Sequence, residues 1–125
     1  SSVKPEEAET YAEKIIIFMQ SGKPFLDPNL TLAQLSDALE IPSHYLSQVI
    51  NEVFGLNFFN FVNGYRVEEV KLRILNPKYD SFSVLGIALE CGFNSKTAFN
   101  RIFKNMTGLT PTEYKKANSH QSIHL

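Results

Sequence analysis

Apolar residues recur along this chain at spacings of three and four positions nearly everywhere, and strict alternation over four or more positions is absent. Spacings of three and four place side chains on one face of an α-helix, whereas a half-buried strand alternates with a period of two. A clear example near the N-terminus is the series Ala8, Tyr11, Ile15, Phe18 and Met19. The pattern therefore predicts an all-α protein.

Start and stop signals divide this pattern into seven helices. Ser, Thr or Asn stands before several of them, where its side-chain oxygen can accept a hydrogen bond from a first-turn N–H, and Gly or Pro follows several of them. Thr31 with Gln34, and Thr110 with Glu113, have the spacing of a capping box, and Asn57 is a further expected cap. The segment "KPFLDPNL" reads as a connecting loop. The expected helices span residues 5–22, 32–40, 43–54, 58–75, 84–91, 95–107 and 111–117.

Two of the expected helix pairs repeat one another. A short helix, a tight turn, a second helix and then a glycine occur in residues 31–55 and again in residues 83–108, where Gly92 is placed to end the short helix in a left-handed conformation. This arrangement is a helix-turn-helix, which places its second helix in the major groove of DNA. The matched positions include Thr31 and Ser83, Leu35 and Ile87, Leu39 and Cys91, Leu46 and Phe99, Val49 and Ile102, and Gly55 and Gly108.

Charge is unevenly distributed over a chain whose formal net charge is −1. Residues 1–40 hold three Lys against seven Asp and Glu, whereas residues 81–125 hold five Lys and Arg against two Asp and Glu. An acidic front and a basic rear indicate that only part of the surface meets a polyanion.

The second helix of the second copy has one apolar and one polar face. Phe99, Ile102, Phe103 and Met106 follow the i, i+3, i+4, i+7 rule and are expected to face the core. Arginine fits guanine O6 and N7, asparagine can pair with adenine, and lysine neutralises phosphates. Charge alone fits a solvated helix face equally well, but the helix-turn-helix context favours DNA. The expected DNA-facing residues are Lys96, Thr97, Asn100, Arg101 and Lys104.

The second helix of the first copy is polar but uncharged on its outer face. Its buried stripe is expected to be Leu46, Val49, Ile50 and Val53, and Glu52 nearby would repel phosphate. Taken alone this is a plain surface helix, but as the partner of a basic recognition helix it becomes a second candidate recognition helix, with lower affinity for DNA. The candidate DNA-facing residues here are Ser43, His44, Ser47, Gln48 and Asn51.

The helix expected over residues 58–75 can connect the two candidate recognition helices, 43–54 and 95–107. It is roughly 27 Å long at about 1.5 Å per residue, and successive major-groove faces lie about 34 Å apart. One monomer could therefore place both recognition helices in adjacent major-groove turns, with some bending of the DNA. The expected organisation is an acidic N-terminal helix and loop (1–27), the first helix-turn-helix (28–56), the linker helix (57–77), the second helix-turn-helix with a C-terminal helix (78–117) and a flexible tail (118–125).

Other functions have little support in the residues. The longest apolar run, "IIIFM", is too short to cross a bilayer and no cleavable signal precedes it, so we expect a cytoplasmic protein. The only cysteine, Cys91, excludes an internal disulfide and is expected to pack in the core. His120 and His124 are expected in a frayed end rather than a metal site. We expect no catalytic residues, no cofactor and no metal, because no phosphate loop, carboxylate pair or activated nucleophile is present.

The stretch "IALECGFNSKTAFNRIFKNMTGLTPTEYKK" carries an ordered set of residues at its turn, recognition helix and final motif. These are Gly92, Phe93, Phe99, Arg101, Phe103, Lys104, Gly108, Thr110, Pro111 and Tyr114. The set resembles the C-terminal signature of the AraC-type bacterial transcription regulators, and the resemblance extends over about residues 28–117. This sequence departs from that family's pattern with Glu40, which stands where the first turn commonly has glycine, and with Gly64 and Gly86 inside helices.

The resemblance implies a transcription regulator that binds double-stranded DNA through two helix-turn-helix subdomains on a linker helix. It implies a longer protein with a sensor or dimerisation region, and we also expect RNA polymerase as a candidate partner. The base-facing residues that it implies are His44, Ser47 and Gln48 in the first copy and Lys96, Thr97, Asn100 and Arg101 in the second. The alternative is a helical protein-interaction module that has lost DNA affinity, motivated by the acidic first 40 residues and the uncharged first reading helix.

Overall fold

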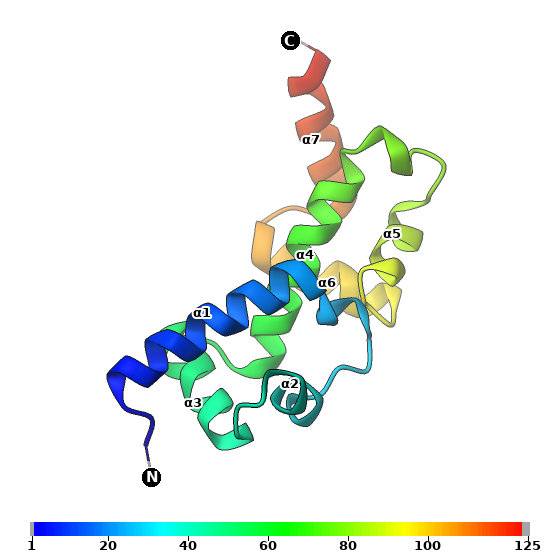
Figure 1. The fold of residues 1–125 in the computed structure, drawn as a ribbon. Coiled ribbons are helices and arrows are strands. Elements are labelled where there is room, and N and C mark those ends of the chain that lie inside the picture. Colours follow the sequence, from blue (N-terminus) through cyan, green and yellow to red (C-terminus); the bar gives the residue numbers. More distant parts are fainter. Residues whose placement is uncertain (1, 124–125) are drawn as a thin grey trace. The chain divides into compact units, whose positions relative to one another are not determined.

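The computed structural model describes residues 2–123, and the side chains of residues 2–119 (Figure 1). These residues form seven α-helices and no strand, which confirms the all-α prediction and its helix count. Two 3₁₀ turns, Pro24–Leu26 and Pro77–Tyr79, lie in connections that the sequence left without structure. The helices are α1 (Pro5–Gly22), α2 (Leu32–Leu39), α3 (Ser43–Val53), α4 (Phe58–Ile74), α5 (Val84–Glu90), α6 (Lys96–Thr107) and α7 (Pro111–Ile123).

The chain folds as two compact units, the first ending at Asn63 and the second beginning at Gly64. The first contains α1, α2, α3 and the start of α4, and the second contains the rest of α4 with α5, α6 and α7. The division falls inside α4, so this helix contributes buried residues to both units: Phe61 and Val62 to the first, Val67 and Val70 to the second. No helix in the described part of the chain combines the length and apolar character that a membrane crossing requires.

Local hydrogen bonds at the helix starts match the caps that the sequence predicts. The Thr31 hydroxyl accepts the N–H of Gln34 at 3.1 Å, and the Gln34 side chain accepts the N–H of Thr31 at 3.0 Å. The same reciprocal pair joins Thr110 and Glu113, at 3.1 and 2.8 Å. Asn57 Oδ1 accepts an N–H from the first turn of α4 at 2.7 Å. Each cap satisfies donors that the helix itself leaves unpaired, which fixes where α2, α4 and α7 begin.

The cap at the start of α7 makes the stability of the second unit depend on pH. The pKa of Glu113 is lowered because its carboxylate accepts hydrogen bonds from the backbone and side chain of Thr110 and is attracted by Lys104. A lowered folded-state pKa means that the cap stabilises fully above the unfolded pKa, about 4.3 for glutamate, and loses this contribution as pH falls through the folded pKa. We expect Glu113→Gln, whose amide oxygen can still accept the Thr110 N–H, to show a weaker fall of the melting temperature below about pH 4 than wild type. Parallel pH profiles for the two proteins would contradict this.

The last helix extends further than the sequence predicts. It was expected to end at Ala117 but continues to Ile123, and the Asn118 side chain donates to the Tyr114 carbonyl at 2.9 Å. The helix-end prediction is wrong because residues 112–123 contain no glycine or proline to stop the helix. Of the expected flexible tail (118–125), residues 124–125 lie outside the described residues, as do the side chains of His120 and His124.

Glu40 ends α2 in a left-handed conformation, with φ 56°. This conformation crowds a Cβ and costs a non-glycine residue about 1–2 kcal/mol, which explains why glycine would suit the position. We therefore expect Glu40→Gly to raise the free energy of unfolding of the first unit by about 1 kcal/mol in denaturant titrations. Glu40→Ala removes the carboxylate but keeps the Cβ, and is the matched control. An equal gain from both variants would show that charge, not backbone strain, is responsible.

Two residues that the sequence assigns to buried stripes are exposed. Val53 is 49% exposed and Met106 is 41% exposed, although Leu46, Ile50 and Phe99 on the same stripes are buried. Val53 and Met106 both lie in the last turn of their helices, α3 and α6. The periodicity continues there, but at the helix end the rest of the unit covers these side chains only in part.

Candidate nucleic-acid interface

The second helix-turn-helix is built from α5, a tight turn and α6. The Ser83 hydroxyl accepts the Gly86 N–H at 2.9 Å, and a Cβ at Gly86 would lie 3.0 Å from this oxygen, so the glycine leaves room for the cap. Gly92 has φ 102°, which confirms the expected left-handed stop after α5. The Ser95 hydroxyl then accepts the Ala98 N–H at 3.1 Å and begins α6. These local bonds set the direction in which α6 leaves the turn.

Aromatic side chains hold the inner face of α6 against its unit. Phe99 contacts Phe93 with ring centroids 5.1 Å apart and Phe103 at 5.7 Å, and Phe103 meets Tyr114 of α7 edge-on at 5.6 Å. Phe99, Ile102 and Phe103 are each at most 5% exposed. Rings packed in this way determine the rotation of α6 about its axis, and hence which side chains it presents to solvent.

The outer face of α6 presents all five residues that the sequence assigns to DNA. Within the described residues, Lys96, Asn100 and Arg101 form no hydrogen bond or ion pair, so their donors are available to a ligand. Lys104, one turn beyond Asn100, is also close enough to Glu113 to lower its pKa. No carboxylate lies on α6 itself. The exposed set is Lys96, Thr97, Asn100, Arg101 and Lys104.

The first helix-turn-helix has a different character. The Ser36 hydroxyl donates to the Ile41 carbonyl, which ties the turn back to α2, and Leu46, Val49 and Ile50 bury the inner face of α3. The outer residues are not equally accessible: Ser43, His44 and Asn51 are exposed, whereas Ser47 and Gln48 are half-buried.

Gln48 is already engaged within the chain. Its Oε1 accepts the backbone N–H of Val3 at 3.1 Å, and its Nε2 donates to Glu52 Oε2 at 3.1 Å. Sequence reasoning did not anticipate the contact with Val3, because the two residues are 45 positions apart and no periodicity relates them. The structure therefore presents α6 as a free polar face and α3 as one whose central amide is occupied.

Helix α1 packs on the first helix-turn-helix. Tyr11 stacks on Tyr45 with ring centroids 6.4 Å apart, and Tyr45 in turn contacts His44 at 4.4 Å. The Lys14 ammonium donates to the Leu39 carbonyl at the end of α2, which satisfies an acceptor that the helix leaves free. Tyr45 therefore packs between α1 and α3.

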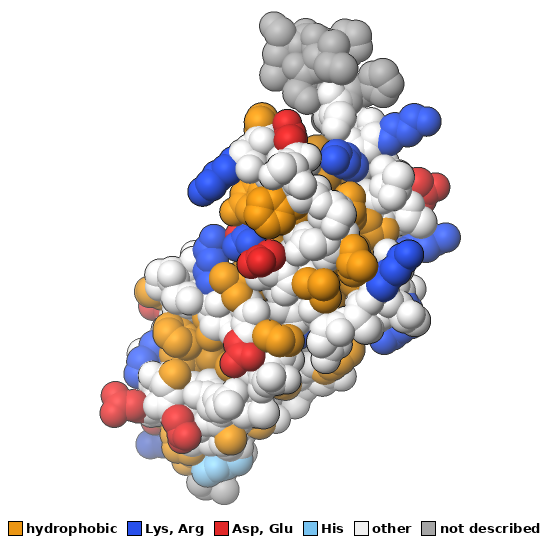
Figure 2. Space-filling model, turned by 90° about the vertical axis from the view of Figure 1, so that its right-hand side faces the viewer, with side chains coloured by type: hydrophobic (Ala, Val, Ile, Leu, Met, Phe, Trp, Pro, Cys, Tyr) orange, Lys and Arg blue, Asp and Glu red, His pale blue; other side chains and the backbone are white. Residues whose placement is uncertain are grey.

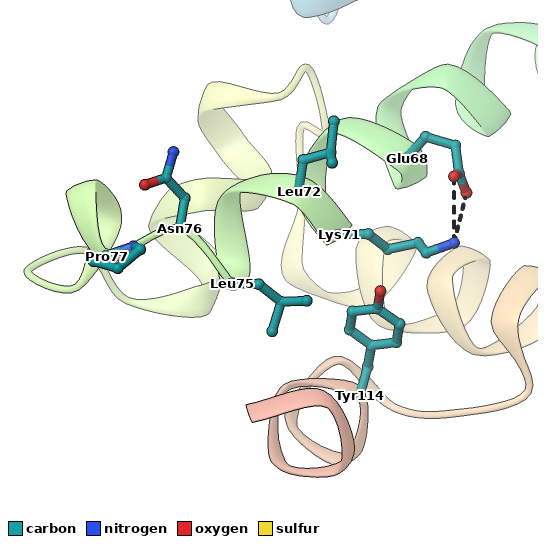
Figure 3. A pocket seen from close by; sticks show the side chains of 7 residues that line it. All are labelled: Glu68, Lys71, Leu72, Leu75, Asn76, Pro77 and Tyr114. Atoms are coloured by element: carbon teal, nitrogen blue, oxygen red, sulfur yellow. Dashed lines mark hydrogen bonds and ion pairs between the residues drawn. The ribbon is translucent and has the colours of Figure 1, made fainter. Parts of the chain in front are cut away.

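A groove of about 500 Å³ lies in the second unit between α4 and α7 (Figure 3). Lys71 Nζ lies 3.0 Å from Glu68 Oε2 and 5.7 Å from the centre of the Tyr114 ring, so its charge is already paired. Leu72 is 69% exposed beside it. Figure 2 shows exposed hydrophobic side chains between projecting Lys and Arg side chains on one face of the molecule. The groove is lined by Glu68, Lys71, Leu72, Leu75, Asn76, Pro77 and Tyr114.

Metal chemistry has no support in the described part of the chain, where no group of three or more His, Cys, Asp or Glu is placed to hold an ion. Cys91 is buried at the end of α5, and its N–H bonds to carbonyls of that helix. Its packing role agrees with the sequence-based expectation.

Comparison with known proteins agrees with this architecture. Residues 35–117 match the family described as a helix-turn-helix domain. An uncharacterized HTH-type transcriptional regulator of Staphylococcus aureus (strain COL) is 34% identical over 87 residues, which are 70% of this chain and 11% of that protein. The chain thus spans about a tenth of the length of such relatives.

Two solved structures share the fold. The C-terminal domain of the two-component response regulator yesN from Fusobacterium nucleatum is 28% identical with a TM-score of 0.64, covering 85% of this chain and 98% of that one. A Chromobacterium violaceum transcriptional regulator, of the AraC-type DNA-binding domain-containing proteins, is 16% identical with a TM-score of 0.73, covering 87% and 92%. The chain belongs to the AraC-type helix-turn-helix family, a family of DNA-binding transcription regulators.

Proposed function

We propose that this chain binds double-stranded DNA sequence-specifically, with α3 and α6 as recognition helices in successive turns of the major groove. The observation that carries the proposal is the outer face of α6, where five exposed polar side chains stand on a helix fixed by buried rings and free of carboxylates. An α-helix fits the major groove, and Arg and Asn have the donor and acceptor geometry that reads guanine and adenine there.

The two recognition helices have different roles in this proposal. Lys96 and Lys104 supply attraction to phosphates, and Asn100 and Arg101 read bases. The five outer residues assigned on α3 include no Lys or Arg, and they add selectivity with little electrostatic attraction. Helix α4 has 17 residues and is about 26 Å long at about 1.5 Å per residue, a length comparable with the roughly 34 Å between successive major-groove turns.

A footprint on a duplex selected from random sequences tests the proposal that both α3 and α6 are recognition helices. We expect protection of two half-sites about one helical turn apart. Gln48→Ala should change base preference only in the half-site that α3 reads, by about 1–3 kcal/mol at one position. Asn105→Ala is the matched control, because Asn105 is exposed on α6 outside the assigned set. If only one half-site is protected and Gln48→Ala leaves the base preference unchanged, the role of α3 is structural.

A helical protein-interaction module is the second candidate. It is favoured by the groove between α4 and α7, where Leu72 and Leu75 are exposed and Lys71 is paired with Glu68. An open, mostly apolar groove fits a protein surface better than it fits a polyanion.

The curated relatives are much longer than this chain, and one structural neighbour is the C-terminal domain of a response regulator. We propose that a sensor or signalling region accompanies this domain in the full-length protein. We further propose that the full-length protein acts in the cytoplasm, where bacterial DNA lies, and that this domain is not catalytic. Contact with RNA polymerase has no support among the described residues.

A further inference from the structure

The segment that precedes α1 lies against the first recognition helix. The Val3 N–H donates to Gln48 Oε1 at 3.1 Å, and the Val3 side chain is only 9% exposed. Val3 thus donates to a side chain 45 positions later in the sequence, and its own side chain is buried. Residue 3 therefore makes a tertiary contact with α3.

This contact uses the atoms that DNA would need. A glutamine recognises adenine in two places at once, because Oε1 accepts from N6 and Nε2 donates to N7. In this structure Oε1 is bonded to Val3 and Nε2 to Glu52. Each bond occupies one of the two positions on Oε1 or on Nε2, and together they hold the amide against Val3 and Glu52, so a bidentate contact with adenine competes with them.

Other contacts keep the segment in place. Tyr11 stacks on Tyr45 of α3, and Lys14 bonds to the Leu39 carbonyl, so α1 is attached to both helices of the first helix-turn-helix. At the start of α1 the Lys4 N–H donates to Glu7 Oε1 at 3.4 Å, which connects residues 2–4 to the first turn. Glu6 and Glu7 also place negative charge in that first turn, which disfavours a phosphate there.

We propose that residues 2–4 form a clasp that holds Gln48 away from DNA, so that the first recognition helix is autoinhibited while α6 is free. The inference rests on the proposed DNA-binding function and concerns the regulation of that site. Binding of an adenine-bearing half-site by α3 is then coupled to release of the clasp. Exchange of the Val3 hydrogen bond lowers affinity for that half-site about three- to tenfold.

The test compares clasp variants of the full chain on two duplexes, one carrying both selected half-sites and one carrying only the α6 half-site. Val3→Pro removes the N–H donor and keeps an apolar side chain, and Ser2→Pro is the matched control one position earlier. We expect Val3→Pro to bind the two-site duplex about three- to tenfold more tightly than wild type, and the α6 duplex equally. In a Gln48→Ala background this gain should vanish.

Amide exchange of the wild-type chain provides a readout that needs no substitution. The Val3 amide should exchange more slowly than the Ser2 amide in the free protein, and should lose that protection on the two-site duplex but not on the α6 duplex. The clasp is overturned if the Val3 amide is unprotected, or if Val3→Pro binds like wild type while Gln48→Ala still weakens binding. An equal gain from Val3→Pro in both backgrounds also overturns it. Absence of DNA binding by wild type would instead remove the proposed function, and the clasp with it.

Discussion

Replacing Arg101 with alanine is expected to weaken binding to the selected duplex by about 1–3 kcal/mol, which is roughly 5- to 150-fold in affinity. Arg101 is exposed near the middle of α6 and makes no hydrogen bond or ion pair within the described residues. Its guanidinium is therefore free to donate to O6 and N7 of one guanine. The loss should be largest at one base pair, and the melting temperature of the free protein should hardly change.

Lys104 on the same helix is the contrasting position. Lys104→Ala should weaken all sequences by a similar factor and reduce the dependence of log affinity on log salt by about one unit, since it removes one phosphate contact. Competition titrations of both variants against duplexes with single base changes separate the two roles. Arg101→Ala losing affinity uniformly, or Lys104→Ala losing it selectively, would contradict the assignment.

Replacing Phe103 with alanine is expected to destabilise the second unit by about 3–5 kcal/mol. Phe103 is fully buried, and its ring contacts Phe99 at 5.7 Å and Tyr114 at 5.6 Å, so the truncation leaves a cavity where α6 meets α7. Because small domains are stable by only about 5–15 kcal/mol, such a loss is large enough to unfold much of this unit at moderate temperature.

Met106 provides the control for the loss at Phe103. It lies in the same helix and belongs to the same apolar stripe, but is 41% exposed. Met106→Ala should therefore cost well under the 2–5 kcal/mol typical of truncating a buried methionine. Denaturant titrations followed by a probe in the second unit provide the measurement. Similar losses at the two positions would mean that α6 is not anchored by its rings.

The helices that begin with a cap were predictable because their signals are local. Thr31, Asn57, Ser83 and Thr110 each bond to a backbone N–H within the next three residues, so short sequence windows contain the information. Helix ends were less predictable where no glycine or proline marks them, as at the extension of α7 to Ile123.

The polar face of α6 was also predictable, because periodicity and burial agree over its first three turns. The exposure of Val53 and Met106 was not, since a periodic stripe does not reveal where the covering side chains stop. The engagement of Gln48 by Val3 was out of reach for a different reason. It depends on how α1 packs on α3, a tertiary arrangement that neither propensity nor spacing encodes.

The central claim, that this domain binds DNA through a basic recognition helix, is tested most directly by titrating the chain with a labelled duplex library at two salt concentrations. The account predicts sequence-dependent binding at low salt that weakens steeply as salt rises, by a slope of about 0.9 for each phosphate neutralised. Indifference to every duplex at low salt would contradict it and would favour the protein-interaction alternative.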